Sequence, residues 1–382
     1  MKKNKYIRCT KGVWDNTIPD IKFDNSGISN YYKRFLLYEK EYPTGNVGKE
    51  KWDKILKEIK QKGKKSKYDC IIGLSGGVDS CYLLHLAVNV WGLRPLAFNL
   101  DNGWNSKIAV KNIKLMTDAL NVDLETYVID YNEVKSVLKS FMYANLPWVD
   151  GATDWAIKSS ILQIASKENI KSILVGTDFR SEGKQPEEWT HIDSKLFNYV
   201  TKKFGNIKLK TYPNISNFKQ LYLGLIKRIK KYQPFYFIDY NKSEAKNFLI
   251  ENYNWEDYGG HHHENLFTKF IISYWLKEKF NIDKRIITYS AQVVSGNLDR
   301  DKAIKLLKSP PYENSRMELD LETVLNKLDL DKNEFTNIWN QKNKSFKDYP
   351  SYYEFINKNK NFLSKYYFLF MATKPKMLIS DE

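Results

Sequence analysis

Residues 75–80, with the sequence SGGVDS, have the composition and the position of a loop that binds phosphate. They follow directly on the apolar residues 70–74, which predict a buried strand. Gly76 and Gly77 carry no Cβ and can both adopt positive φ, so they leave backbone N–H groups accessible to an anion. A helix over residues 79–90 would add its own N-terminal N–H groups at the same point. The run therefore predicts a phosphate-binding turn between a strand and a helix.

The side chains of this run fit ATP. The hydroxyls of Ser75 and Ser80 add donors, and the carboxylate of Asp79 is an oxygen ligand of the kind that Mg²⁺ prefers. The Walker pattern, which ends in Gly-Lys-Ser/Thr, is absent from the run. The run instead resembles the SGGxDS signature of the PP-loop ATP pyrophosphatases, which bind the β,γ-pyrophosphate and cleave ATP to AMP. An ordinary turn is the alternative, and the complete six-residue run favours the ATP site. The expected contacts are Ser75, Gly76, Gly77, Val78, Asp79 and Ser80.

The composition is that of a folded protein without repeats. The 382 residues are 15% aromatic and 28% charged, which allows one large domain with a smaller one. No apolar run approaches the roughly 18 to 20 residues of a membrane span, and residues 1–5 lead into polar sequence rather than a signal peptide. We therefore expect a cytoplasmic protein. Cys9, Cys70 and Cys81 are too few for a disulfide framework and predict core packing.

The net charge of +16 is compatible with three kinds of partner. Nucleic acid, phosphate-rich small substrates and an anionic membrane surface would each suit it. Much of the excess lies in lysine runs such as residues 60–67 and 227–231. A solvated surface explains these runs as well as a binding patch does.

Apolar patterning predicts an α/β protein. Expected strands and helices alternate at residues 70–74, 79–90, 94–100, 106–120, 126–130, 153–165 and 172–176. This order is typical of an open, mainly parallel sheet with helices on both faces, a Rossmann-like fold. Residues 265–280 predict a further helix, and the chain beyond Pro310 has helical spacing, whereas residues 195–236 are basic and aromatic without clear alternation.

Four regions follow from this pattern. They are an N-terminal segment (1–66), an ATP-binding domain (67–200), a region that completes the site (201–310) and a helical C-terminal extension (311–382).

Residues 255–264, with the sequence WEDYGGHHHE, form a second candidate site. Gly259 and Gly260 let the backbone approach a ligand, and His262 and Glu264 then stand at the start of a helix. We interpret the block as binding substrate or handling protons, with a structural turn as the main alternative. A zinc site is less favoured because consecutive histidines point in different directions.

Two further pairs allow two interpretations each. Trp255 and Tyr258 are either core residues or a surface on which a sugar stacks. Lys284 and Arg285 either contact the phosphates of a nucleotide-sugar or form ordinary salt bridges.

Taken together, these motifs resemble the N-acetyl sugar amidotransferases of bacterial surface polysaccharide, lipopolysaccharide and nonulosonic-acid pathways, a branch of the PP-loop ATPases. The resemblance extends over nearly the whole chain. It rests on residues 18–24 with Gly27 and Ile28, then 75–80, 255–264, 283–285, Ser295 and Gly296 with Arg300, 310–312, and Tyr349 with Pro350.

The resemblance implies use of ATP and Mg²⁺ to adenylate the N-acetyl group of a nucleotide-linked sugar. Ammonia then replaces the oxygen and gives an acetamidino group, AMP and pyrophosphate. The implied catalytic residues are Asp79, Asp101, Asp178, Lys184, His262 and Glu264. Asp101, Gly176, Thr177 and Asp178 would bind adenosine or magnesium, and Lys158, Arg180 and Lys184 would reach the α-phosphate. The implied substrate contacts are Trp255, Tyr258, Gly259, Gly260, His262, Lys284 and Arg285.

One departure concerns the N-terminal segment. Many members of this family carry two CxxC pairs there, which resemble a zinc knuckle. In this chain Cys9 remains, while Gly12, Ser29 and Tyr32 occupy the other positions. A single thiolate cannot complete a tetrahedral site, so we predict no zinc.

No cysteine stands in the context of a glutaminase nucleophile. The resemblance therefore implies that ammonia comes from separate glutaminase and cyclase-type subunits. The alternative function is a tRNA-modifying PP-loop enzyme of the lysidine synthase or thiolase type, supported by the net charge and by the lysines and aromatics of residues 195–240. The small number of cysteines argues against sulfur transfer, and we expect no stable nucleic-acid complex. A scaffold or ATP sensor without turnover is a third alternative.

Overall fold

The computed structural model describes residues 6–260, 263–312 and 314–366. In these ranges five parallel strands form one sheet in the order β3-β2-β1-β4-β5. The strands are β1 (Cys70–Gly73), β2 (Pro95–Asp101), β3 (Leu124–Val128), β4 (Ser172–Leu174) and β5 (Lys230–Tyr232). Ile71 in the central strand is in register with Leu96 of β2 and Ile173 of β4. The predicted open parallel sheet is confirmed, and its strands all end at the same edge.

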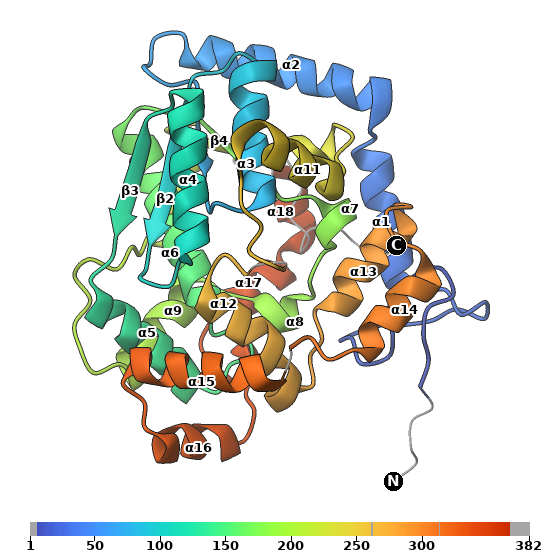
Figure 1. The fold of residues 1–382 in the computed structure, drawn as a ribbon, viewed down its shortest axis with the longest axis vertical. Helices are drawn as coiled ribbons and strands as arrows, with labels where there is room; N and C mark the ends of the chain where they lie inside the picture. Colours follow the sequence, from blue (N-terminus) through green and yellow to red (C-terminus); the bar gives the residue numbers. More distant parts are fainter. Residues whose placement is uncertain (1–5, 261–262, 313, 367–382) are drawn as a thin grey trace.

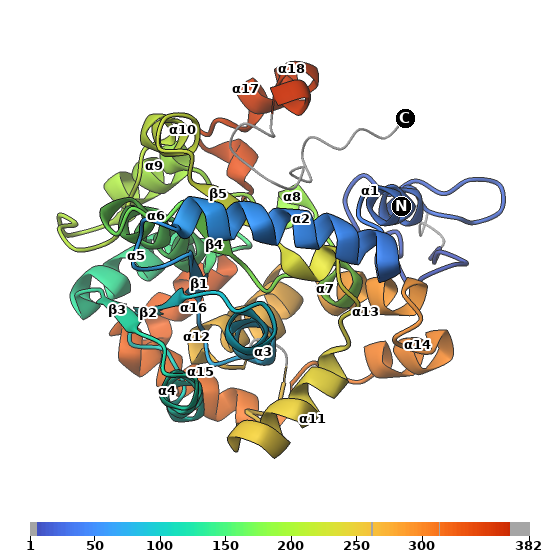
Figure 2. The same ribbon diagram turned by 90° about the horizontal axis from the view of Figure 1, so that it is seen from above.

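Helices cover both faces of the sheet (Figures 1 and 2). Up to β5 they are α1 (Asn30–Glu41), α2 (Gly45–Gly63), α3 (Val78–His85) with its π-helical continuation η1 (Leu86–Val90), α4 (Lys107–Leu120), α5 (Tyr131–Tyr143), α6 (Gly151–Lys167), α7 (Phe179–Glu182), α8 (Glu187–Thr190), α9 (Ser194–Phe204) and α10 (Asn217–Leu225). After β5 come η2 (Pro234–Tyr236), α11 (Lys242–Tyr253), α12 (Leu266–Phe270), η3 (Ile271–Lys279), α13 (Arg285–Val294), α14 (Arg300–Lys308), α15 (Asn314–Leu328), α16 (Lys332–Asn340), η4 (Phe346–Asp348), α17 (Tyr353–Lys358) and α18 (Lys360–Tyr366).

Two buried clusters lie on opposite faces of the sheet. Ile71 belongs to one cluster, together with Trp155 of α6. Its neighbour Ile72 belongs to the other, together with Trp52 of α2. Successive side chains of a strand point to opposite faces, so an apolar strand such as β1 needs helices on both sides.

The structure differs from the predicted elements in detail. The third strand, expected at residues 126–130, is Leu124–Val128, and α6, expected at residues 153–165, is Gly151–Lys167. Residues 195–236, which showed no clear pattern, contain most of α9, all of α10 and the edge strand β5. Strand β5 reads Lys-Lys-Tyr and pairs only with β4. A short lysine-rich strand suits an edge but carries no apolar signal.

The C-terminal region is helical, as expected. Val324 and Leu328 of α15 and Ile338 of α16 are buried in the same cluster as Ile71, so these helices pack against the sheet domain. The region boundaries at residues 66, 200 and 310 stay predictions. None of the helices in the described ranges is long and apolar enough to cross a membrane.

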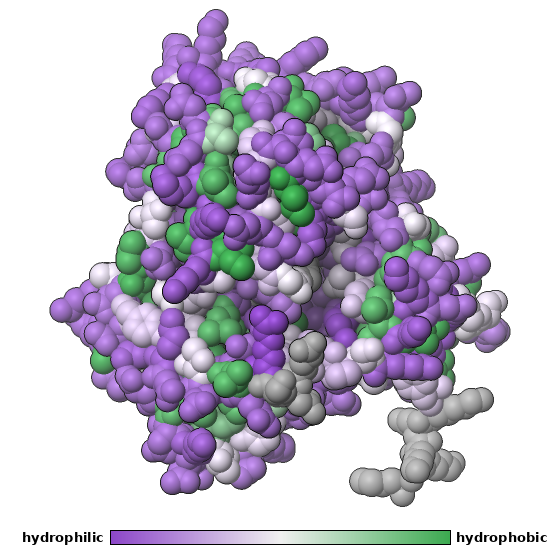
Figure 3. Space-filling model, in the orientation of Figure 1, coloured by the Kyte–Doolittle hydropathy of each residue, from purple (hydrophilic) through white to green (hydrophobic). Residues whose placement is uncertain are grey.

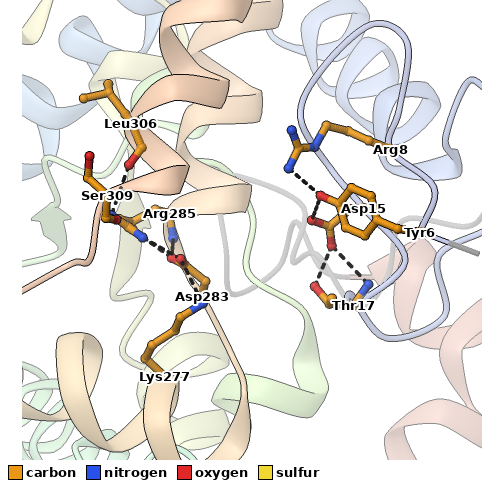
Figure 4. A network of polar contacts seen from close by, with 9 residues as sticks. All are labelled: Tyr6, Arg8, Asp15, Thr17, Lys277, Asp283, Arg285, Leu306 and Ser309. Carbon is orange, nitrogen blue, oxygen red and sulfur yellow. Dashed lines mark hydrogen bonds and ion pairs between the residues drawn. The ribbon is translucent and has the colours of Figure 1, made fainter. Parts of the chain in front are cut away.

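Hydrogen bonds organise the N-terminal segment. The Cys9 thiol accepts a bond of 3.3 Å from the Ser29 amide. The Arg300 guanidinium donates to the carbonyls of Cys9 and Gly12 at 3.0 and 3.1 Å. The Tyr6 hydroxyl donates to Asp15 at 2.7 Å (Figure 4). Cys9, Cys70 and Cys81 are all buried thiols.

Candidate active site

The SGGVDS run joins β1 to α3 in a turn that requires glycine. Gly76 has φ +80°, and a Cβ at this position would lie 2.3 Å from the Ala109 carbonyl oxygen of α4. Gly77, with φ −79°, is the N-cap residue of α3. The turn therefore packs tightly on α4, and its second glycine begins the helix.

The hydroxyl groups of the turn bind the turn itself. The Gly77 amide donates to Ser75 Oγ at 3.3 Å. Ser80 Oγ donates to the Gly77 carbonyl at 3.1 Å and lies 3.3 Å from Ser75 Oγ. Neutral bonds of this length are weaker than charge-assisted ones, so an anion can compete for these donors.

Residues 255–264 pack directly on this turn. The Trp255 indole donates to the Gly76 carbonyl at 3.0 Å, and the Asn112 amide donates to the same oxygen at 3.3 Å. Trp255 is 2% exposed, which favours the core interpretation over a sugar-stacking surface. A Cβ at Gly77 would lie 3.0 Å from the Tyr258 hydroxyl, so this side chain also faces the turn.

Backbone bonds hold Glu264 beside the turn. The Ser106 amide donates to the Glu264 carbonyl at 2.8 Å, and the Leu266 amide donates to the Trp104 carbonyl at 3.0 Å. A Cβ at Gly77 would lie 3.8 Å from Glu264 Oε1. The Glu264 carboxylate is therefore close to the proposed phosphate site.

His263 packs against a glycine of this block. A Cβ at Gly260 would lie 2.4 Å from the ring of His263, so that imidazole packs against the glycine. Gly259 has φ +88° and nothing within 4 Å of a built Cβ. His262 lies outside the described residues.

Asp79 is held by two residues that the sequence did not single out. Lys242 Nζ lies 2.6 Å from Asp79 Oδ2, with side-chain exposures of 29% and 20%. The Tyr240 hydroxyl donates a short bond to Asp79 Oδ1. Burial lowers the pKa of Lys242, but the carboxylates of Asp79, Glu182 and Glu264 outweigh it, so the net shift is upward. The ammonium group is thus the local countercharge of this acidic cluster.

The residues that follow β4 lie against Asp79. A Cβ at Gly176 would lie 2.8 Å from the Asp79 carbonyl oxygen. Thr177 Oγ1 accepts from the Gln233 amide at 3.0 Å. Asp178 caps α7 by accepting from the Ser181 amide at 2.9 Å, and burial raises the pKa of its carboxyl group.

Asp101 ends β2 and accepts from the Gly103 amide at 2.9 Å. In Figure 3 the face that includes this region is mostly hydrophilic and is hollowed between α11, α12 and α13.

Three predicted site residues are engaged elsewhere. Lys184 contacts the Tyr236 hydroxyl and lines a separate cavity of about 180 Å³ beside α1. Lys284 Nζ lies 3.8 Å from the ring centroid of Trp148. Arg285 pairs with Asp283 at 2.7 Å and also donates to the Ser309 carbonyl at 3.0 Å (Figure 4), which favours the salt-bridge interpretation.

The looser α-phosphate candidates also have other contacts. Arg180 donates to the Tyr42 carbonyl at 2.6 Å. Lys158 Nζ is 5.1 Å from the ring centroid of Trp155.

Residues 264–360 match the protein family described as LPS biosynthesis protein WbpG-like, C-terminal domain. This part of the chain is WbpG-like. The match begins at Glu264 and runs through α12 to α17. For the C-terminal region it confirms the resemblance to surface-polysaccharide biosynthesis proteins.

Other similarities are partial or remote. An uncharacterized protein of Methanocaldococcus jannaschii is 35% identical over 86 residues, which is 22% of this chain and 30% of that relative, so the match spans less than a third of the relative's length. NH3-dependent NAD synthetase from Campylobacter jejuni shows 15% identity and a TM-score of 0.32 over 65% of this chain and 94% of its own. NMN synthetase from Francisella tularensis shows 15% identity and a TM-score of 0.30 over 74% of this chain and 97% of its own. The U34-tRNA thiolase NcsA from Methanococcus maripaludis shows 13% identity and a TM-score of 0.33 over 79% of this chain and 88% of its own. Structural likeness at this level does not discriminate between reactions.

Proposed function

We propose that the protein is an ATP-dependent, AMP-forming amidotransferase that acts on the N-acetyl group of a nucleotide-linked sugar. One observation carries the proposal. The WbpG-like stretch begins at Glu264, whose carboxylate lies near Gly77, and Trp255 in the segment before the stretch donates a hydrogen bond to Gly76 of the SGGVDS turn. A segment leading into a surface-polysaccharide domain is thereby joined to a turn with the form of an ATP site.

The reaction would proceed in two balanced steps. The acetamido oxygen attacks the α-phosphorus of ATP, and pyrophosphate leaves with the electron pair of the broken P–O bond. Ammonia then attacks the activated carbon, loses a proton, and expels AMP together with the original amide oxygen. The product is an acetamidino sugar. Such a reaction depends mainly on positioning and on neutralising negative charge.

The described residues suit ATP and Mg²⁺. Ser75, Gly76, Gly77, Val78 and Ser80 would bind the pyrophosphate, and Asp101, Gly176 and Thr177 would bind on the adenosine side. Among the described residues no group of three or more His, Cys, Asp or Glu side chains is arranged for a metal. Mg²⁺, however, commonly binds through one or two carboxylates together with substrate phosphates. Asp79 would hold it together with the ATP phosphates, and bound Mg²⁺ would supply charge neutralisation at the phosphate oxygens.

The remaining roles stay predictions. Glu264 with His262 would handle the protons of ammonia, and Tyr258, Gly259 and Gly260 would bound the site. Contacts of Lys184, Lys284 and Arg285 with substrate phosphates also stay predictions. Ammonia would reach the site from separate glutaminase and cyclase-type subunits in the cytoplasm.

A tRNA-modifying activity is the second candidate, favoured by one surface. Helix α10 and the turn after it expose Phe218 and Tyr222 beside exposed Lys219, Lys227 and Arg228. Aromatic and basic groups in this combination are typical of single-stranded nucleic-acid binding.

The test is pyrophosphate release from ATP with Mg²⁺ and ammonium chloride. UDP-N-acetylglucosamine, UDP-N-acetylgalactosamine and CMP-N-acetylneuraminate are compared with bulk tRNA, and Asp79→Asn serves as the matched inactive variant. We expect release that depends on one of the sugars, needs no glutamine and is lost in the variant. Release that depends on tRNA and falls steeply with salt would transfer the protein to the second function.

A further inference from the structure

A cavity of about 370 Å³ lies beside α7, next to the proposed ATP site. Asp178 and Arg180 line one side, and Asp239 and Tyr240 line another. Tyr240 connects the cavity to the ATP site because its hydroxyl binds Asp79. The Tyr240 ring stacks on Phe235 with centroids 4.0 Å apart, and both rings line the cavity. A molecule in this cavity would thus be adjacent to the residue that holds ATP.

The lining is polar and carries more acid than base. It includes one guanidinium, that of Arg180, and four carboxyl side chains, those of Glu39, Asp178, Asp239 and Glu244. The charge of Arg180 is already engaged by Glu39 at 3.8 Å and by the Tyr42 carbonyl at 2.6 Å. Such a lining repels phosphate and offers acceptors to hydroxyl and amide donors.

Asp178 has unused capacity of this kind. The residue is 2% exposed, and its Oδ2 caps α7. In the described part of the chain its other oxygen, Oδ1, is buried and has no hydrogen-bond partner. A buried acceptor left without a donor is energetically unfavourable. A ligand hydroxyl or amide N–H that reached this oxygen would recover that energy.

The WbpG-like stretch supplies the remaining wall. Ser295 and Asn297 line the cavity from the turn between α13 and α14. Gly296 between them has φ +76°, a conformation that favours glycine. Helix α13 is fixed to α7, because Gln292 donates to the Ser181 carbonyl at 2.9 Å and Thr288 donates to the Glu182 carbonyl at 3.1 Å. The Ser-Gly motif at 295–296, which had no role so far, thus forms a rigid part of this cavity.

We propose that this cavity binds the sugar ring of the substrate, with its hydroxyl groups on the acidic and amide side chains, its acetamido group toward Tyr240 and the ATP site, and the diphosphate outside. This inference rests on the proposed function. The volume lies in the range of about 300–1,000 Å³ typical of small-molecule sites. It is roughly ten times the ~30 Å³ share of a water-sized species, so a sugar ring fits this space better than ammonium alone.

The test uses the full chain with a double variant, Asp239→Ala with Asn297→Ala. Both residues are exposed at the cavity and cap no helix. The matched control, Asp53→Ala with Asn340→Ala, removes the same two side-chain types from exposed positions of α2 and α16. KM values for UDP-N-acetylglucosamine, UDP-N-acetylgalactosamine, CMP-N-acetylneuraminate, ATP and ammonium are measured by pyrophosphate release, and thermal unfolding checks the fold.

We expect the cavity variant to raise KM for the active sugar at least about tenfold, because two hydrogen-bonding groups are lost. KM for ATP and for ammonium should stay within about twofold of the control. A raised KM for ammonium with an unchanged sugar KM would overturn the inference and assign the cavity to ammonium. Unchanged values for every substrate would also overturn it while leaving the proposed function intact. A wild-type protein without sugar-dependent release from any of the three would overturn the proposed function itself, before the variants are compared.

Discussion

Alanine substitutions at the two adjacent glycines should have opposite consequences. Gly76→Ala should destabilise the fold, whereas Gly77→Ala should leave the fold nearly intact and weaken ATP binding. The contrast follows from backbone conformation and from what each added Cβ would meet. An ordinary structural turn would show no separate effect on ATP.

The magnitudes follow from the geometry. Alanine at Gly76 would adopt φ +80°, which costs about 1–2 kcal/mol for an L-residue. Its Cβ would also lie 2.3 Å from the Ala109 carbonyl oxygen, and such overpacking adds about 1–3 kcal/mol. The free energy of unfolding should therefore fall by about 2–5 kcal/mol.

Alanine at Gly77 meets softer neighbours. With φ −79° the backbone is unstrained, and the added Cβ would lie 3.0 Å from the Tyr258 hydroxyl and 3.2 Å from Ser75 Oγ, two side-chain ends that can move. Loss of a glycine N-cap should cost no more than about 1 kcal/mol. The methyl group would, however, occupy the space where phosphate approaches the turn, and ATP affinity should fall at least about tenfold.

Urea unfolding followed by tryptophan fluorescence measures the first effect, and calorimetric titration with ATP and Mg²⁺ measures the second. The reasoning fails if Gly76→Ala unfolds at the wild-type urea concentration. It fails equally if Gly77→Ala binds ATP as well as the wild type.

Three further substitutions probe charges and bonds. Lys242→Met should lower the free energy of unfolding by about 1–3 kcal/mol. The pKa of this lysine is raised in the folded state, so its ion pair stabilises the fold fully below about pH 10.5. The urea midpoint of the variant should therefore lie below that of the wild type up to this pH, and the difference should shrink as the pH rises through the folded pKa. Burial lowers the pKa of His191, but Asp193 at 2.9 Å helps to raise it overall. The protonated imidazole therefore stabilises the fold fully below about pH 6.5, and this stabilisation is lost at higher pH. His191→Gln should lower the urea midpoint more at pH 6 than at pH 9. Arg300→Ala removes two bonds to N-terminal carbonyls, and limited trypsin digestion should cut after Lys11 at least about tenfold faster.

Patterns within short stretches of sequence were sufficient to predict most strands and helices of the sheet domain. Strand β1 and helix α4 show their period plainly, because a strand buried on both faces reads as an apolar run and an amphipathic helix repeats its apolar positions. The helix expected at residues 106–120 begins directly after Ser106, whose hydroxyl accepts from the Ala109 amide at 3.1 Å. Strand β5 was missed because pairing with β4, rather than its own residues, makes Lys230–Tyr232 a strand.

The site was predictable only where residues adjacent in sequence form it. The turn at Gly76 and Gly77 was recognised from its own run, whereas Lys242 was not. Its position at the first residue of α11 follows from the Asn241 cap, but its contact with Asp79 spans 163 positions of the chain. Among so many lysines, only the tertiary fold distinguishes this one. Arg285 illustrates the converse, because the sequence left this motif residue two interpretations and its ion pair with Asp283 favours the salt bridge.

The bond from the Trp255 indole to the Gly76 carbonyl has a consequence for biosynthesis. It joins residues 179 positions apart. A ribosome adds about 5–20 residues per second. The turn would therefore be synthesised roughly ten seconds or more before Trp255, the donor of this bond. The bond from Arg300 to the Cys9 carbonyl spans 291 positions, so the N-terminal segment waits longer still. A nascent chain can therefore form the first strands early, but the SGGVDS turn gains its bond from Trp255 only after the segment leading into the WbpG-like stretch has left the exit tunnel.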